Sequence, residues 1–139
     1  MTPDNIKLVQ ESFRKVVPIA GTAADLFYDR LFEIAPELRH MFPQDLREQK
    51  KKLIGMLATA VNNLHHFDQI RPAVEELGRR HLGYGVADEH YKPVGEALLW
   101  TLEQGLGKDF TPAVKEAWTQ AYLAVADTMK LAARRKLAA

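Results

Sequence analysis

The sequence of 139 residues contains no cysteine, which excludes disulfides, thiolate metal sites, iron–sulfur ligation and cysteine nucleophiles. It also lacks an excess of charge of either sign. Nineteen Lys and Arg stand against 18 Asp and Glu, so no overall field draws the chain to nucleic acid or to an anionic membrane. No apolar run approaches the length of a membrane span, and residues 1–5 carry no pattern of a secretory signal. We therefore expect a soluble, cytoplasmic protein without nucleic-acid or membrane partners.

Apolar residues recur at helical spacing along the whole chain, and no alternating strand pattern or internal repeat is present. A content of 47% hydrophobic and 27% charged residues is typical of a globular protein, and the length suits one domain over residues 1–139. The spacing predicts an all-α domain with six substantial helices joined by short turns. The predicted helices run over about residues 3–16, 24–34, 46–64, 72–83, 91–106 and 112–136, and the basic residues 134–136 suit the negative end of the last helix.

Helix boundaries are indicated by capping residues and by prolines. Thr2 and Thr111 each precede a proline, as an N-cap residue before the first helical position does. Pro18 and Gly21 are expected to separate the first two helices, and Pro36 to end the second.

Three polar residues lie on apolar helical stripes: Tyr28, Gln49 and His81. Burying each without a partner costs about 1–3 kcal/mol, so each needs a function or a hydrogen bond. One interpretation is that each finds a backbone carbonyl or another partner within the core. The alternative interpretation is that the three form one site in a slot with apolar walls.

A slot with one histidine does not suit a bare divalent ion, which requires three or four protein ligands. It suits a flat apolar cofactor that itself supplies four ligands to its metal. Haem held by a proximal histidine has this requirement, and the periodicity permits it.

Four segments in order resemble the globin family, most closely bacterial single-domain globins and the haem domain of flavohaemoglobins. Residues 26–42 resemble its B helix, C turn and CD corner. Residues 77–85 and 90–99 resemble its F and G helices, and residues 117–122 its H helix. The resemblance implies a globin fold of six to eight helices around a haem b group.

The resemblance also implies roles for individual residues. His81 falls at the position of the proximal iron ligand, and Phe42 at that of the phenylalanine that stacks on the porphyrin. Tyr28, Gln49 and Leu53 fall on the distal side, where the diatomic ligand binds. The other residues expected to contact the cofactor are Lys52, Leu77, Arg80, Val86, Tyr91, Val94 and Leu98.

Lys52 and Arg80 are expected near the haem edge, where a cation can pair with a propionate. Read alone, each is an ordinary solvated basic side chain. The remaining histidines lie at helix ends or turns and are expected at the surface: His40, His65, His66 and His90.

The distal residue types fit oxygen chemistry. A phenol O–H or an amide N–H favours a ligand that carries partial negative charge, such as dioxygen on ferrous iron, over neutral carbon monoxide. Glutamine does not readily ligate iron, so the distal position is expected to be open or filled by water.

Two features depart from flavohaemoglobins. In that family a tyrosine and a glutamate next to the proximal histidine increase electron donation to the iron. Tyr91 matches the tyrosine, but Ala133 occupies the position of the glutamate, so strong donation is not expected. Flavin and nicotinamide reductase domains are also expected to be absent, so electrons would come from a separate reductase.

The sequence thus predicts a monomer or weak dimer that binds haem and, reversibly, dioxygen, with nitric oxide and carbon monoxide as further ligands. The alternative is a nitric oxide dioxygenase that forms nitrate with the same Tyr28 and Gln49 pocket. A haem-based sensor would need an output module, and a haem-free helical adaptor would not need His81.

Overall fold

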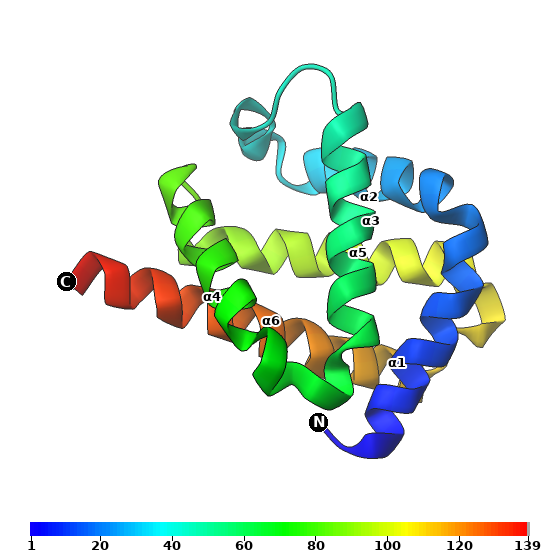
Figure 1. The fold of residues 1–139 in the computed structure, drawn as a ribbon. Helices are drawn as coiled ribbons and strands as arrows, with labels where there is room; N and C mark the ends of the chain where they lie inside the picture. Colours follow the sequence, from blue (N-terminus) through cyan, green and yellow to red (C-terminus); the bar gives the residue numbers. More distant parts are fainter. Residues whose placement is uncertain (139) are drawn as a thin grey trace.

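The computed structural model describes residues 1–138, which form six α-helices and no strand, as predicted (Figure 1). Five short 3-10 turns lie within the connections, one of them, η2, over Pro36–Met41. The helices are α1 (Pro3–Val16), α2 (Ala20–Ile34), α3 (Arg47–Asn62), α4 (Phe67–Gly83), α5 (Tyr91–Leu106) and α6 (Pro112–Ala138). Within the described part of the chain, no helix has the length and apolar character needed to cross a bilayer.

The predicted caps form. The Asn5 N–H donates to Thr2 Oγ1 at 3.1 Å, and the Val114 N–H donates to Thr111 Oγ1 at 3.2 Å. Each bond gives a partner to an amide that the first helical turn leaves unpaired. At the C-terminal end of α5, Gly107 has a φ of 55°, a conformation that glycine adopts without strain.

Two predicted boundaries were wrong. The helix expected from about Pro72 begins at Phe67, so Pro72 lies inside α4. Pro72 and Asp68 are both exposed, and water can therefore bind the Asp68 carbonyl that the proline leaves without a donor. Gly21 does not interrupt the helical pattern, because α2 begins at Ala20 and the turn at Val17–Ile19 alone separates it from α1.

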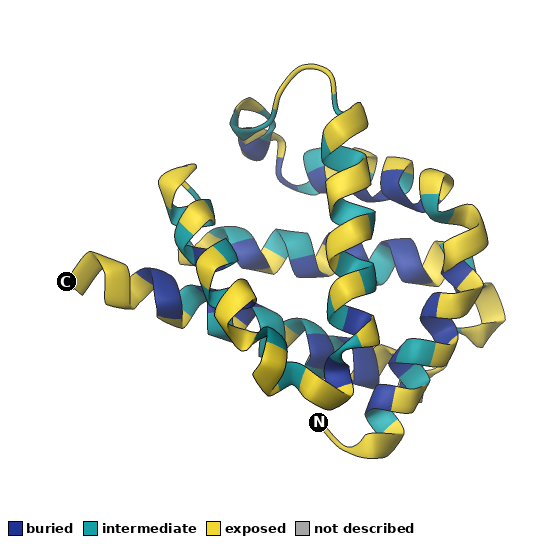
Figure 2. Ribbon diagram, in the orientation of Figure 1, coloured by how far each residue is buried: buried dark blue, intermediate teal, exposed yellow. Residues whose placement is uncertain are grey.

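The main core lies where α1, α2, α5 and α6 pack against one another (Figure 2). Val9 and Ala97 are fully buried there, and Trp118 is 2% exposed. The Trp118 indole donates to Ser12 Oγ at 2.8 Å, and the Ser12 hydroxyl donates to the Leu8 carbonyl at 2.7 Å. The one indole in this core thus has a partner, which removes the cost of burying its N–H.

Helices α3 and α4 cover the remaining side and bury far fewer residues. Val61 is the buried residue of α3, and Val74 and Gly78 are those of α4. A Cβ at Gly78 would collide with the backbone of Met129, so α4 meets α6 backbone to backbone at this crossing. This close approach sets the position of the last two turns of α4.

Candidate functional site

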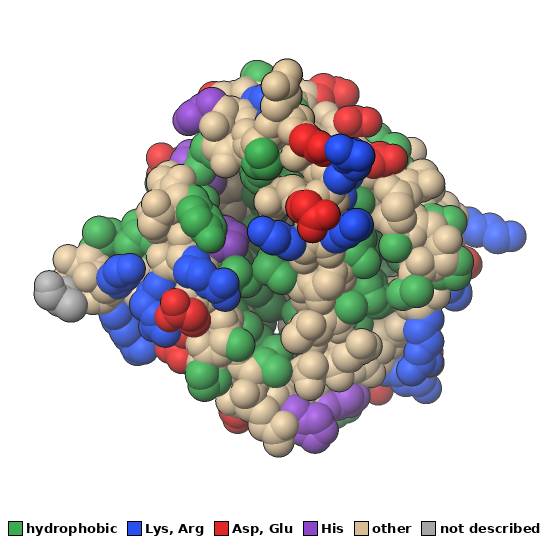
Figure 3. All heavy atoms as spheres, turned by 45° about the horizontal axis from the view of Figure 1, so that its top comes forward, with side chains coloured by type: hydrophobic (Ala, Val, Ile, Leu, Met, Phe, Trp, Pro, Cys, Tyr) green, Lys and Arg blue, Asp and Glu red, His purple; other side chains and the backbone are tan. Residues whose placement is uncertain are grey.

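A cavity of about 250 Å³ lies between α3 and α4, with side chains of α2, α5 and α6 forming its inner wall. Its lining is almost entirely aliphatic and aromatic. On the face shown in Figure 3, hydrophobic side chains form the floor of a hollow, and Lys and Arg side chains lie at its edge. The cavity is thus an apolar chamber in which a few polar groups can determine what binds.

Eleven of the twelve predicted site residues line this one cavity. The exception is Arg80, which is exposed and does not line it. The lining members are Tyr28, Phe42, Gln49, Lys52, Leu53, Leu77, His81, Val86, Tyr91, Val94 and Leu98. The fold therefore brings together residues that lie up to 70 positions apart in the sequence, from Tyr28 to Leu98.

His81 is held by its own helix. Its Nδ1 lies 2.8 Å from the Leu77 carbonyl oxygen, so Nδ1 carries the proton and donates it. Burial lowers the pKa of His81 and Arg80 lowers it further, against the opposing effect of the Leu77 hydrogen bond. The imidazole is therefore neutral at pH 7. No residue among 1–138 makes a hydrogen bond to Nε2, so this nitrogen keeps a lone pair for a ligand.

Tyr28 lies at the opposite wall within a cluster of aromatic rings. Its ring centroid is 4.9 Å from that of Phe27, 5.7 Å from Phe42 and 6.0 Å from Phe32. Burial raises the pKa of Tyr28, and the adjacent Gln49 side chain opposes that rise. Tyr28 therefore keeps its O–H at neutral pH, and the two predicted distal donors lie next to each other.

Lys52 and Leu53 follow Gln49 on α3. Leu53 is half-buried against the main core, whereas Lys52 is exposed at the cavity rim. Within residues 1–138 no carboxylate lies within ion-pair distance of Lys52. Its ammonium is therefore available to an anionic group at the mouth of the cavity.

The surroundings of Tyr91 differ from those of the flavohaemoglobin network. The Nδ1 of His81 donates to the Leu77 carbonyl, and no hydrogen bond between His81 and Tyr91 is present in the described part of the chain. Ala133 is buried and carries no carboxylate, while Lys130 Nζ lies 5.4 Å from the Tyr91 ring centroid. The His81 imidazole thus has a neutral hydrogen-bond partner.

Tyr122 lines the cavity, although it was not among the residues predicted to contact the cofactor. Its hydroxyl donates to the Tyr91 carbonyl at 2.5 Å, and its ring covers Gly95, where a Cβ would lie 2.7 Å from the ring. Burial raises the pKa of this phenol strongly. Tyr122 therefore acts as a protonated donor that fixes the start of α5.

His90 also lines the cavity, although we predicted it at the surface. It is half-buried, and its Nδ1 accepts the Ala87 N–H at 2.9 Å. Its spacing was a usable signal, because His90, Val94 and Leu98 recur every four residues and so share a helical face. The other three histidines, His40, His65 and His66, are exposed as predicted.

The residues present fit a haem group. Within residues 1–138 no cluster of three or more His, Asp or Glu side chains could hold a bare metal ion. A neutral imidazole with an unpaired Nε2 in an apolar cavity suits a metal that arrives with its own macrocycle. The protein is thus an all-α domain with a cavity whose residues fit a haem group.

Comparisons with known proteins identify the family. The family model described as Globin matches residues 25–129, which is more than half of the chain. The flavohemoprotein of Bacillus subtilis is 33% identical over 124 residues, covering 84% of this chain and 31% of that protein. That of Vibrio cholerae is 30% identical over 129 residues, covering 91% of this chain and 33% of that protein.

Solved structures show the same fold. A bacterial globin from Campylobacter jejuni superposes with a TM-score of 0.83 at 25% identity, covering 99% of this chain and 100% of that one. An engineered carbene transferase from Rhodothermus marinus, a candidate nitric oxide dioxygenase, gives a TM-score of 0.89 at 24% identity, with coverage of 99% and 96%.

The chain belongs to the globin family. It spans about a third of the length of the curated flavohemoproteins that it matches. Membership implies a haem cofactor, which agrees with the donor set of the cavity.

Proposed function

We propose that this protein binds haem b through His81 and reversibly binds dioxygen, with Tyr28 and Gln49 as the distal donors. The observation that carries this proposal is that one cavity contains two complementary sets of polar groups. One wall presents a neutral imidazole with a free Nε2, and the other presents a buried phenol beside an amide.

Bound haem would supply an iron centre that takes one protein ligand and leaves a position for a diatomic gas. The residues of the chain do the rest. Tyr28 keeps its proton and aims an O–H at a ligand with partial negative charge, and Gln49 offers an amide N–H to the same small volume. Leu53 and Phe42 narrow the distal space and exclude water.

Charged groups are proposed to hold the carboxylate edge of the cofactor. Lys52 lies at the cavity rim, where it can pair with one carboxylate. Arg80 is exposed one residue before His81 and can reach only a group that extends beyond the cavity lining. Both contacts are weak, because water screens exposed ion pairs.

The substitution Tyr28→Phe tests the distal proposal. Loss of one hydrogen bond to a charge-bearing acceptor, worth about 1.5 kcal/mol, should accelerate oxygen release roughly tenfold in stopped-flow experiments. Tyr84→Phe is the matched control, since Tyr84 is 66% exposed and does not line the cavity. An unchanged release rate in Tyr28→Phe, with normal haem content, would remove Tyr28 from this role.

A second candidate function is nitric oxide dioxygenation. It is favoured by the relatives, which are named flavohemoproteins, and by the Rhodothermus neighbour named as a candidate dioxygenase. Each turnover would consume one nitric oxide, one dioxygen and one electron, and would yield nitrate. The same Tyr28 and Gln49 donors would serve this reaction, but the electron must come from a reductase.

Steady-state nitric oxide consumption separates the two functions. Purified protein is supplied with dioxygen, nitric oxide and a flavin reductase with its nicotinamide donor. Sustained consumption with stoichiometric nitrate supports the dioxygenase. A single turnover followed by accumulation of ferric protein supports oxygen binding as the function.

A further inference from the structure

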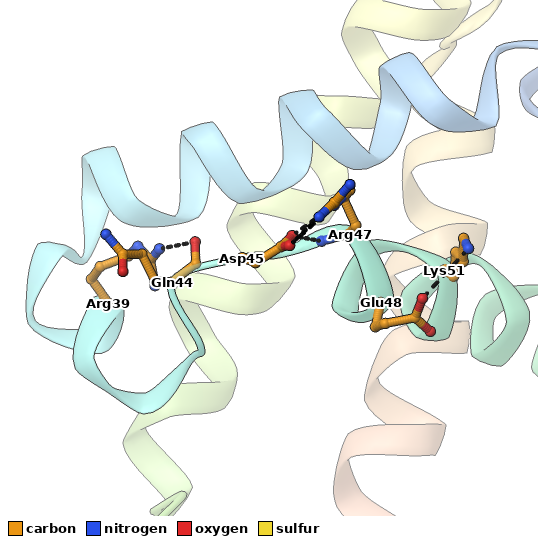
Figure 4. A network of polar contacts seen from close by, with 6 residues as sticks. All are labelled: Arg39, Gln44, Asp45, Arg47, Glu48 and Lys51. Carbon is orange, nitrogen blue, oxygen red and sulfur yellow. Dashed lines mark hydrogen bonds and ion pairs between the residues drawn. The ribbon is translucent and has the colours of Figure 1, made fainter.

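The side chain of Arg39 gathers three consecutive carbonyl groups of the segment between η2 and α3. Its Nη1 donates to the Phe42 carbonyl at 3.3 Å and to the Pro43 carbonyl at 3.0 Å. Its Nη2 donates to the Gln44 carbonyl at 3.1 Å, the contact drawn in Figure 4. The guanidinium thus supplies the hydrogen-bond donors that these carbonyls would receive from backbone amides in a helix or strand.

The same guanidinium lies over an aromatic ring. The Arg39 Cζ is 5.1 Å from the Phe32 ring centroid, and Phe32 packs edge to face on Phe42 at 5.4 Å. Phe32 and Phe42 both also pack against Tyr28. Arg39 therefore holds the aromatic cluster twice, through the ring of Phe32 and through the backbone of Phe42.

The other charged pairs of this segment have no such contact. Arg47 binds Asp45, and Lys51 binds Glu48, with exposed side chains in both pairs (Figure 4). Neither pair touches an aromatic ring of the cluster. Among the charged side chains of this region, Arg39 is therefore the one that contacts both the segment and an aromatic ring of the cluster.

We propose that Arg39 is a positioning residue that orients the distal hydroxyl of Tyr28. It does so by fixing residues 42–44, which keep the Phe42 ring against Phe32 and Tyr28. Without the guanidinium, the three carbonyls turn to water and Phe42 loses its fixed position, so the phenol can rotate away from its ligand. This inference rests on the donor role proposed for Tyr28.

The test is a double-mutant cycle on the haem-loaded protein, made from Arg39→Met and Tyr28→Phe. One readout is the oxygen release rate, and the other is the infrared stretching band of carbon monoxide bound to the ferrous protein, which reports the field of the distal donors. Arg39→Met should accelerate oxygen release on the order of threefold to tenfold and shift the band toward its Tyr28→Phe position. In the Tyr28→Phe background it should change neither readout further.

Two more variants separate positioning from general stability. Arg39→Lys keeps the charge but has neither the planar fork nor its stacking, so its band should lie between those of wild type and Arg39→Met. Arg71→Met is the matched control, because Arg71 also stacks on a ring, that of Phe67 at 5.0 Å, but neither residue lines the cavity. It should leave both readouts unchanged.

Equal effects of Arg39→Met in the two backgrounds, or no effect in the wild-type background, would overturn this proposal. If Tyr28→Phe accelerates release and Arg39→Met does not, the donor role of Tyr28 survives and the positioning role fails. If Tyr28→Phe itself changes nothing, both proposals fail.

Discussion

Helices α3 and α6 both line the cavity, and they are held in place in different ways. Helix α6 buries eight residues along 27, among them Ala117 and Trp118, in contact with α1 and α4. Helix α3 buries one residue along 16, and its Met56 is 40% exposed although it lines the cavity. Both helices line the chamber, but α6 is also packed against α1 and α4, whereas most of the apolar side chains of α3 face the chamber that a ligand would fill. We therefore expect α6 to keep its position without a ligand and call it the scaffold. We expect the stability of α3 to depend on a bound ligand and call it the wall.

The largest effect is expected from removal of the His81 imidazole, because without bound haem α3 would lose the ligand against which it packs. His81→Ala deletes the unpaired Nε2 that is proposed to ligate the haem iron. We expect haem content to fall by about a hundredfold or more, measured as Soret absorbance per protein after expression with ample porphyrin precursor. His40→Ala alters an exposed histidine and should retain normal haem. Normal Soret absorbance of His81→Ala without added imidazole would contradict the ligand assignment.

Amide hydrogen exchange measures the comparison directly. In the haem-free protein, amides of α3 should exchange much faster than those of α6, because few of its side chains are buried. Saturating haemin should slow exchange in α3 by about tenfold or more, through the mass-action stabilisation that binding provides. Amides in the middle of α6 should change less. Similar protection of the two helices before haemin is added would refute the division into scaffold and wall.

Overpacking the crossing of α4 and α6 by Gly78→Ala should lower the free energy of unfolding by about 1–3 kcal/mol. In Gly78→Ala the new methyl meets the Met129 backbone, which cannot rotate away as a side chain would. Gly83→Ala, at the last residue of the same helix, meets nothing within 4 Å and should be neutral or slightly stabilising. Urea denaturation of both variants gives the two free energies of unfolding. Equal values would show that the backbones do not meet.

The smallest expected effect is the alkaline pH dependence. Burial raises the pKa of Tyr28 at the cavity, and it raises the pKa values of Tyr91 and Tyr122 on the scaffold side. Above about pH 10 the unfolded chain loses these phenolic protons first, so stability is present below pH 10 and falls as the pH rises beyond it. The loss should be on the order of 1 kcal/mol by pH 11, measured by urea denaturation. A stability independent of pH between 9 and 11 would argue against three buried phenols.

Much of this arrangement was predictable because it depends on local periodicity. The helices, the caps at Thr2 and Thr111 and the placement of Tyr28 and His81 on inward faces all follow from spacing within single helices. The contacts of Arg39 with the carbonyls of residues 42–44 and with the Phe32 ring were not predictable. They depend on how the chain after Phe42 bends back toward Phe32.

Other misses arose from reading local signals too strictly. The sequence predicts that a helix begins at Pro72, yet an exposed proline is tolerated within α4 because solvent can satisfy the free carbonyl. His90 was assigned to the surface from its place at a helix end, although its four-residue spacing to Val94 indicated the inner face. In both cases tertiary contacts and solvent access decide, and a local motif does not report them.

The contact of Gly78 with Met129 has a mechanical consequence for His81, which lies one helical turn further along α4. Two main chains that touch without intervening side chains leave nothing compressible between them. A force that pulls the imidazole toward or away from the chamber therefore strains the C-terminal helix as well, so the residue proposed to hold the iron cannot move without α6.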